Sequence, residues 1–200
     1  MLRTLWPTLI ALLALGGCTT DPAPAAPPPP PVEAGPLTGG DTTARALSLE
    51  FTERQLPERH YLVFRQRLPL LDMNGFLAME ARTLGAAAGA KNIEPNGPAT
   101  ALFYEWDVER GVGEAAVALP VAAGTTLPPY VTIVLPATRA LSATLNGPYD
   151  GLGAVHYALE SELRRRGLSP ATPSIEEYLV GPAQGATPEN FVTRVTYPTR

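Results

Sequence analysis

The chain is poor in the residues that build disulfides and metal sites. Its 200 residues include one cysteine, Cys18, and two histidines, His60 and His156. One thiol excludes an internal disulfide and a thiolate metal cluster, and two imidazoles disfavour a structural zinc site. The net charge is −4 and no block of basic residues occurs, which argues against a nucleic-acid-binding face. We therefore expect no metal, no cofactor and no nucleic-acid partner.

Residues 1–17 have the pattern of a secretory signal peptide. Arg3 precedes an apolar run at residues 5–15 that is too short to span a bilayer. The run ends in Leu15-Gly16-Gly17-Cys18, which resembles the lipobox of bacterial lipoproteins. The resemblance implies that Cys18 is acylated, for example with palmitate, and two or more acyl chains anchor a protein stably to a membrane. An ordinary secretory signal with a chance cysteine is the alternative.

Residues 18–45 are expected to form a linker that begins at the lipidated Cys18. The segment is rich in proline, alanine and glycine, has five consecutive prolines at residues 27–31, and lacks helix or strand periodicity. Polyproline is a semi-rigid spacer of roughly 3.1 Å per residue. Because Thr19 rather than aspartate follows the cysteine, the sorting rule of Gram-negative lipoproteins implies the outer membrane, on its periplasmic side. We predict a lipid-anchored cell-envelope protein whose folded domain occupies residues 46–200.

The hydrophobic pattern of this domain predicts strands and helices in a repeated order. Alternating apolar residues predict strands, and apolar residues at a spacing of three to four predict helices. In the first half, strands are expected at residues 47–52, 61–67, 99–106 and 117–121, with a helix at residues 73–90. In the second half, strands are expected at residues 131–135, 139–145, 174–180 and 191–197, with a helix at residues 152–166. The first two strands are expected to pair with each other.

This order predicts an α+β fold made of duplicated β-β-α-β-β units related by a pseudo-twofold axis. Two helices would pack on one side of an antiparallel sheet, and a ligand cleft would lie on the opposite side. Gly147-Pro148 ends the strand before the second helix because proline cannot continue a ladder. Asp150 is expected to cap that helix and Gly167 to end it. Identity between the halves is weak, so the duplication is inferred from pattern alone.

Four segments resemble the GyrI-like domains, which also serve as effector-binding domains of AraC-type and MerR-type transcription regulators. They are residues 99–107, 114–121, 146–153 and 176–179, and the strongest is Gly-Pro-Tyr-Asp-Gly-Leu-Gly at residues 147–153. The resemblance implies two pseudo-symmetric halves with a cleft at their junction that binds bulky, often cationic and aromatic compounds. It also implies that a glutamate two residues before a tyrosine reaches into the cleft. In this sequence that glutamate is Glu176.

One carboxylate and four aromatic side chains are the candidate ligand-binding residues: Glu176, Tyr178, Tyr104, Trp106 and Tyr149. Aromatic rings attract a cation by about 0.5–2 kcal/mol each, and a bound cation would favour the charged form of the carboxylate. Glu177 departs from the family pattern, which usually has an apolar residue there. The sequence therefore leaves open which of the two glutamates faces the cleft.

The leading hypothesis is a non-catalytic domain that binds or senses a small molecule at the cell envelope. A hydrolase of strained electrophilic compounds is an alternative, with Glu176 and either Tyr104 or Tyr149 as an acid–base pair. A haem-binding module is another, because the SOUL haem-binding proteins resemble this fold, and His156 or His60 would then bind the iron. A purely structural envelope protein is the fourth. No Ser/His/Asp triad has supporting context.

Overall fold

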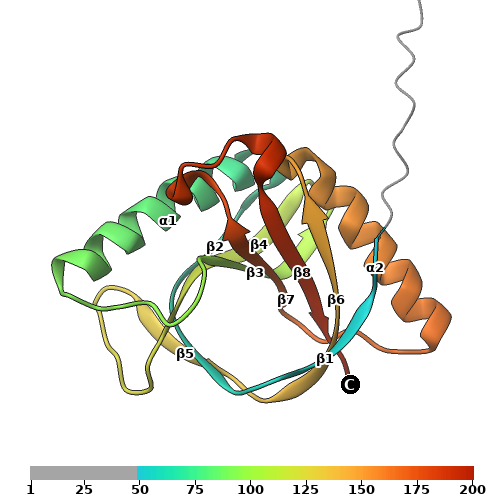
Figure 1. The fold of residues 1–200 in the computed structure, drawn as a ribbon, viewed down its shortest axis with the longest axis horizontal. Coiled ribbons are helices and arrows are strands. Elements are labelled where there is room, and N and C mark those ends of the chain that lie inside the picture. The colour runs from blue at the N-terminus through green and yellow to red at the C-terminus, as the bar shows by residue number, and fades with distance from the viewer. Residues whose placement is uncertain (1–48) are drawn as a thin grey trace, which may run out of the picture. The chain divides into compact units, whose positions relative to one another are not determined.

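Eight strands and two helices make up residues 49–200, the part of the chain that the computed structural model describes (Figure 1). The strands are β1 (Thr52–Leu56), β2 (Arg59–Pro69), β3 (Thr100–Asp107), β4 (Val112–Val121), β5 (Val131–Leu135), β6 (Thr138–Asn146), β7 (Ser174–Val180) and β8 (Val192–Pro198). The helices are α1 (Met73–Ala90) and α2 (Leu152–Arg166). The predicted signal peptide, the lipidation at Cys18 and the linker lie outside the described residues. Within residues 49–200, no helix has the length and apolar character needed to cross a membrane.

All eight strands belong to one antiparallel sheet that curls into a half-barrel (Figure 1). The strand order is β1-β6-β8-β7-β3-β4-β2-β5, so β3 and β7 form the central pair. β1 pairs with β6 and β5 pairs with β2, which means that each half of the chain contributes its first strand to the sheet edge of the other half. The α+β class with an antiparallel sheet is therefore confirmed. The duplication of the β-β-α-β-β unit stays a prediction.

Both helices lie on the same face of the sheet, which we call the helix face. α1 packs on β4 and β2, and α2 packs on β6 and β8, so β3 and β7 lie between them. Leu84 of α1 is buried over Val117, and Leu159 of α2 is buried over Leu141. The opposite face, which we call the barrel face, has its own apolar core around Tyr61 and Leu102. Apolar side chains on both faces explain why the strands are rich in buried residues on either side.

The segment before α2 shows how local sequence sets the start of that helix. Gly147 has φ 131°, a conformation that favours glycine, and a 3-10 turn at Tyr149–Gly151 leads into α2. The predicted cap at Asp150 is wrong, because Asp150 lies within this turn and its side chain makes no capping hydrogen bond. Gly167 ends the helix in the left-handed conformation with φ 65°, as the sequence predicts.

Two predictions about the strands are corrected. β1 begins at Thr52 rather than near residue 47, and β2 pairs with β4 and β5 instead of with β1. The second correction has a topological reason, since β1 crosses to the other half and pairs with β6. A β-bulge in β3 between Phe103 and Glu105 also breaks the expected alternation there. Leu102 and Tyr104 remain on the barrel face, whereas Phe103 and Trp106 lie on the helix face.

Candidate functional site

Two neighbouring glutamates on β7 point to opposite faces of the sheet. Glu176 lies opposite Ala101 and Val195 in the ladder, and Val195 belongs to the core beneath α2, so Glu176 is on the helix face. Glu177 lies opposite Arg194 and lines a pocket on the barrel face. The two residues are 4% and 3% exposed. The carboxylate on the side away from the helices is therefore Glu177 and not Glu176.

Glu176 is held by two hydrogen bonds from the helix side of the sheet. The His156 Nε2 of α2 lies 2.7 Å from Glu176 Oε1, and the Tyr178 hydroxyl donates to Glu176 Oε2 at 2.7 Å. His156 Nδ1 lies 2.8 Å from the hydroxyl of Tyr197, which donates to Glu160 at 3.1 Å. A hydroxyl that donates its only proton to Glu160 accepts the Nδ1 proton of His156, and one further proton is then shared between His156 Nε2 and Glu176 Oε1. Glu176 and His156 are thus joined by a hydrogen bond that is an ion pair only when the imidazole is protonated.

Aromatic rings extend from this carboxylate in both directions. On one side Trp106 contacts Phe103 at 5.8 Å between ring centroids, and Phe103 contacts His156 at 6.0 Å. On the other side the Tyr178 ring contacts Tyr149 at 5.4 Å. We call these six residues the Glu176 cluster: Glu176, His156, Tyr178, Tyr149, Phe103 and Trp106. The cluster lies between α1 and α2, and Trp106 at its end is 54% exposed.

The tyrosine hydroxyls of the cluster keep their protons. Burial raises the pKa of Tyr178 well above its ordinary value, and the charge of Glu176 raises it further. The pKa of Tyr149 is also raised, first by burial and then by Glu176. Both hydroxyls therefore stay protonated at neutral pH. A protonated phenol beside the carboxylate makes the centre of the cluster polar although its surroundings are apolar.

The structure brings together four of the five predicted ligand-binding residues. Glu176, Tyr178, Tyr149 and Trp106 lie in the Glu176 cluster, whereas Tyr104 lies on the barrel face under the Arg65 guanidinium, 3.5 Å from its ring centroid. The bulge at this point of β3 has no recognisable signal in the sequence. Ligand binding by these residues stays a prediction.

His156 and Phe103 are members of the cluster that sequence reasoning missed. His156 follows Val155, a buried residue of α2, so its position beside the apolar stripe could have indicated a side chain directed at the sheet. Both of its ring nitrogens are engaged, with Tyr197 and with Glu176. Neither is free to bind a haem iron in this arrangement.

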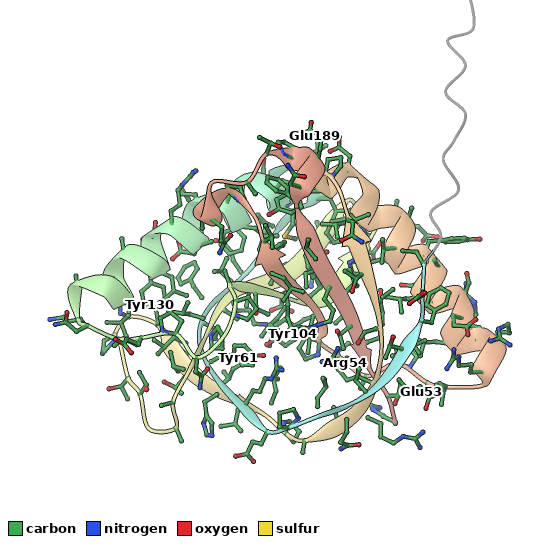
Figure 2. The ribbon with its side chains drawn as sticks, in the orientation of Figure 1. Glu53, Arg54, Tyr61, Tyr104, Tyr130 and Glu189 are labelled. Atoms are coloured by element: carbon green, nitrogen blue, oxygen red, sulfur yellow. The ribbon has the colours of Figure 1, made fainter. Side chains whose placement is uncertain are left out.

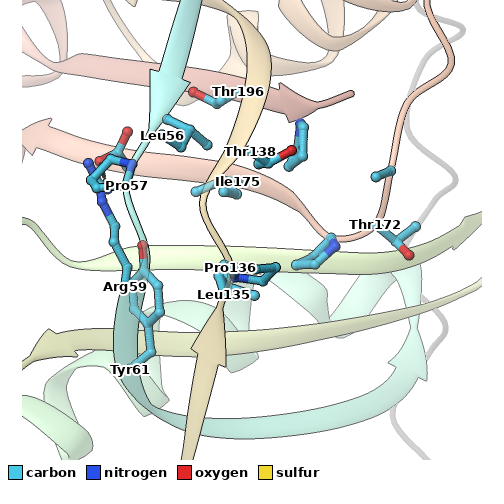
Figure 3. Close-up of a pocket in the computed structure, with 14 residues that line it drawn as sticks. Leu56, Pro57, Arg59, Tyr61, Leu135, Pro136, Thr138, Thr172, Ile175 and Thr196 are labelled. Atoms are coloured by element: carbon cyan, nitrogen blue, oxygen red, sulfur yellow. Dashed lines mark hydrogen bonds and ion pairs between the residues drawn. The ribbon is translucent and has the colours of Figure 1, made fainter. Parts of the chain in front are cut away.

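A pocket of about 110 Å³ lies on the barrel face (Figure 3). It forms where the turns after β1 and β5 meet over the central strands, and apolar side chains such as Leu56 and Ile175 line much of it. Glu177 lies at this pocket and accepts hydrogen bonds from Arg59 at 2.8 Å and Arg194 at 2.7 Å. Burial would raise the pKa of Glu177, but the two guanidinium groups outweigh it and hold that pKa below its ordinary value.

A half-barrel sheet with two helices on one face and a buried carboxylate among aromatic rings between them defines a class of α+β domain. Residues 49–200 match the GyrI-like small molecule binding domain, and the chain belongs to this family. The domain is accordingly a small-molecule-binding domain.

Solved structures of the same fold include a chain in complex with DNA and a complex with a small molecule. The EcmrR chain in a DNA complex with RPo has a TM-score of 0.65 and 16% identity over 79% of this chain, which spans 60% of that chain. The C-terminal domain of EcmrR has a TM-score of 0.62 and 16% identity, covering 77% of this chain and 99% of that chain. SAV2435 bound to tetraphenylphosphonium has a TM-score of 0.60 and 14% identity, covering 76% and 94%. Among curated proteins, none matches the sequence.

Proposed function

We propose that the Glu176 cluster binds a bulky, lipophilic and cationic small molecule. The observation that carries this proposal is a carboxylate that is 4% exposed and bonded to His156 and Tyr178 within a continuous run of aromatic rings. A buried carboxylate is costly unless a positive charge accompanies it, and a ligand cation would take over that role from His156. The aromatic rings would bind the apolar body of the ligand.

The size of the ligand favours the Glu176 cluster over the pocket on the barrel face. Sites for drug-sized ligands measure about 300–1,000 Å³, and the barrel-face pocket has only about 110 Å³. Trp106, at one end of the cluster, is 54% exposed. A bulky ligand would enter there by displacing the side chains of Trp106 and Phe103. The bound tetraphenylphosphonium of SAV2435 makes this cation a suitable probe.

The test is a titration of the full-length chain with tetraphenylphosphonium, followed by calorimetry and tryptophan fluorescence. We expect saturable binding and a loss of about tenfold or more in affinity for Glu176→Gln, because the amide keeps the shape but not the charge. Tyr104→Phe is the matched control, since that tyrosine lies on the barrel face, and it should bind as the unaltered chain does. Equal affinity of Glu176→Gln and the unaltered chain would exclude the cluster as the cation site.

Lipid anchoring at Cys18 places this binding at the cell envelope in our proposal. The lipobox-like Leu15-Gly16-Gly17-Cys18 and the proline-rich segment after it support the anchor. Mass spectrometry of the chain made in a Gram-negative host should detect an acylated Cys18, and Cys18→Ser should move the protein out of the outer-membrane fraction. An unmodified cysteine in the mature protein would contradict the anchor.

We also infer that the domain arose by internal duplication of a β-β-α-β-β unit. The strand order reads the same from both edges when β1, β2, β3 and β4 are exchanged with β5, β6, β7 and β8, which supports the idea. The Glu176 cluster then occupies the junction of the two halves, because β3 and β7 are the equivalent third strands. A superposition of the two units that places α1 on α2 tests this inference.

Hydrolysis of a strained electrophile at the same cluster is a second candidate. The Tyr178 hydroxyl donates to Glu176 at 2.7 Å, so a phenol and a carboxylate are in contact as an acid–base pair requires. This pair replaces the combinations with Tyr104 or Tyr149 that the sequence suggests. Product formation that is lost in both Glu176→Gln and Tyr178→Phe would establish it, and reversible binding without product would exclude it.

A further inference from the structure

The barrel-face pocket contains a buried hydroxyl whose proton has no acceptor. Tyr61 of β2 is 0% exposed, and its hydroxyl, which lies beside the Arg59 guanidinium, donates no hydrogen bond within residues 49–200. Leaving such a group unpaired costs about 1–3 kcal/mol, and buried polar groups in proteins are otherwise nearly always bonded. Figure 3 shows its ring directed from β2 into the space that the pocket residues surround. Burial raises the pKa of Tyr61, so the hydroxyl is a donor.

The charges beside this hydroxyl are unbalanced. Arg59 and Arg194 both pair with Glu177, at 2.8 and 2.7 Å, and occupy one oxygen each. Within residues 49–200 neither arginine pairs with a second carboxylate, so two positive charges share one negative charge. Arg59 uses one of its five N–H donors on Glu177. The polar end of the pocket therefore has spare donors from Arg59 and Tyr61.

Two threonine hydroxyls that line the pocket are already engaged with other partners. The Thr196 hydroxyl is paired with Ser142 at 3.1 Å, and the Thr138 hydroxyl donates to backbone carbonyls. The rest of the lining is mainly aliphatic and proline side chains. A group that fits these surroundings brings oxygen acceptors and one negative charge at one end and an apolar body at the other.

We propose that the barrel-face pocket is a second ligand site, which binds a small monocarboxylate with a short apolar body. The carboxylate accepts hydrogen bonds from the Tyr61 hydroxyl and from Arg59, and it balances the charge of the second arginine. The apolar body packs against Leu56 and Ile175. An apolar cavity of about 150 Å³ holds one benzene molecule. A pocket of about 110 Å³ therefore limits the apolar part of the ligand to a branched chain of a few carbon atoms. This site is independent of the Glu176 cluster, which lies on the other face of the sheet.

The test uses 3-methylbutanoate and its neutral counterpart of the same shape, 3-methylbutanamide. Methyl NMR of the full-length chain should show saturable shifts of Leu56 and Ile175 with the carboxylate. We expect the amide to bind about tenfold more weakly or worse, because it lacks the charge. Tyr61→Phe should weaken carboxylate binding by about tenfold, and Tyr104→Phe, which alters a barrel-face tyrosine outside the pocket lining, should not.

Several results would overturn this second site. They are an absence of saturable shifts at the pocket methyl groups, equal affinity for the acid and the amide, or unchanged binding in Tyr61→Phe. Methyl shifts centred on Val195, which lies opposite Glu176 in the sheet, would assign the carboxylate to the Glu176 cluster instead and would equally contradict the proposal. Tetraphenylphosphonium binding is measured separately, so failure of one site does not imply failure of the other. The acid–amide comparison needs no variant and holds even if Tyr61→Phe is poorly folded.

Discussion

Glu176 and Glu177 are adjacent on β7 and equally buried, yet their partners differ in kind. Glu177 on the barrel face is held by two guanidinium groups, Arg59 and Arg194, which stay charged at any ordinary pH. Glu176 on the helix face is held by an imidazole and a phenol, of which only the imidazole can carry a positive charge. The two carboxylates of this strand thus differ in their partners: those of Glu177 always carry a positive charge, whereas no partner of Glu176 carries a permanent one.

The difference teaches which of the two carboxylates is available for a ligand. Arginine is the residue of choice for buried ion pairs because its planar group donates several hydrogen bonds and never loses its charge. Glu177 is therefore tied into the half-barrel. An imidazole carries no permanent charge, so in our proposal a ligand cation replaces His156 at Glu176 without breaking an arginine ion pair. Glu176 is therefore suited to an exchange of its partner, and Glu177 to a structural role.

The largest effect is expected when the permanent ion pairs are broken. Glu177→Gln leaves Arg59 and Arg194 without their carboxylate, and loss of one partner from a buried ion pair typically costs about 3 kcal/mol or more. We expect the free energy of unfolding to fall by about 3 kcal/mol, measured by urea denaturation.

Glu176→Gln is the matched control for this change. The amide still accepts from the Tyr178 hydroxyl, so its loss of stability should be about 1 kcal/mol. Equal losses in the two variants would show that the two environments do not differ as their partners suggest.

Acid should destabilise the domain chiefly through arginine-paired carboxylates. The pKa of Glu177 lies below its ordinary value because Arg194 and Arg59 outweigh burial, and Arg165 and Arg166 lower the pKa of Glu162 to about 2. Below about pH 5 the unfolded chain takes up protons that the folded chain does not, so stability falls as the pH decreases from there. For Glu162 the loss ends near pH 2.

The measurement is the urea midpoint between about pH 6 and pH 2.5. Glu162→Gln and Glu177→Gln should each flatten this profile on its acidic side, because each removes one group that titrates at different pH in the two states. A profile that keeps its slope in Glu177→Gln would mean that this carboxylate is protonated equally in the folded and unfolded chain.

The sequence predicts where the strands and helices lie along the chain better than it predicts which face of the sheet each residue occupies. The bounds of α2, β5 and β7 agree with the predicted ranges, because each has a clear period and is followed by glycine or proline. Glu176, Tyr178 and Tyr149 are also correctly grouped, since an alternating strand places residues 176 and 178 on one face. Periodicity alone does not tell which face of the sheet the helices cover. The sequence therefore predicts Glu176 in a cleft opposite the helices, whereas the structure has it on the helix face.

The errors concern contacts between distant parts of the chain. The exchange of β1 and β5 between the halves depends on how the sheet closes, which no local pattern encodes. The bulge after Phe103 moves Trp106 to the helix face and leaves Tyr104 on the barrel face, and its residues carry no glycine that would indicate it. Both features decide which aromatic residues surround Glu176.

Two tyrosines allow the faces to be compared at a smaller scale. Tyr178→Phe removes a hydroxyl that donates to Glu176 at 2.7 Å, and we expect it to lower the free energy of unfolding by about 1–3 kcal/mol. Tyr61→Phe removes a buried hydroxyl whose proton has no acceptor within residues 49–200, and we expect stability to be unchanged or slightly increased. Thermal unfolding of the two variants at neutral pH measures both. A clear loss in Tyr61→Phe would mean that its hydroxyl is bonded in solution, for example to a water molecule.

The smallest effect is expected at an ion pair that shares the chemistry of Glu177 but not its burial. Glu114 accepts a hydrogen bond from Arg65 at 2.8 Å on the barrel face of the sheet. This pair is more exposed than the pairs of Glu177 and lies near Tyr104, which is labelled in Figure 2. Exposed pairs contribute about 0–1 kcal/mol, and Arg65 keeps its contact with the Tyr104 ring after the change. Glu114→Gln should therefore lower the free energy of unfolding by less than about 1 kcal/mol in the same urea experiment. A loss as large as that of Glu177→Gln would show that burial does not explain the difference in stability between the two ion pairs. Arginine–glutamate pairs would then stabilise the barrel face whether or not they are buried.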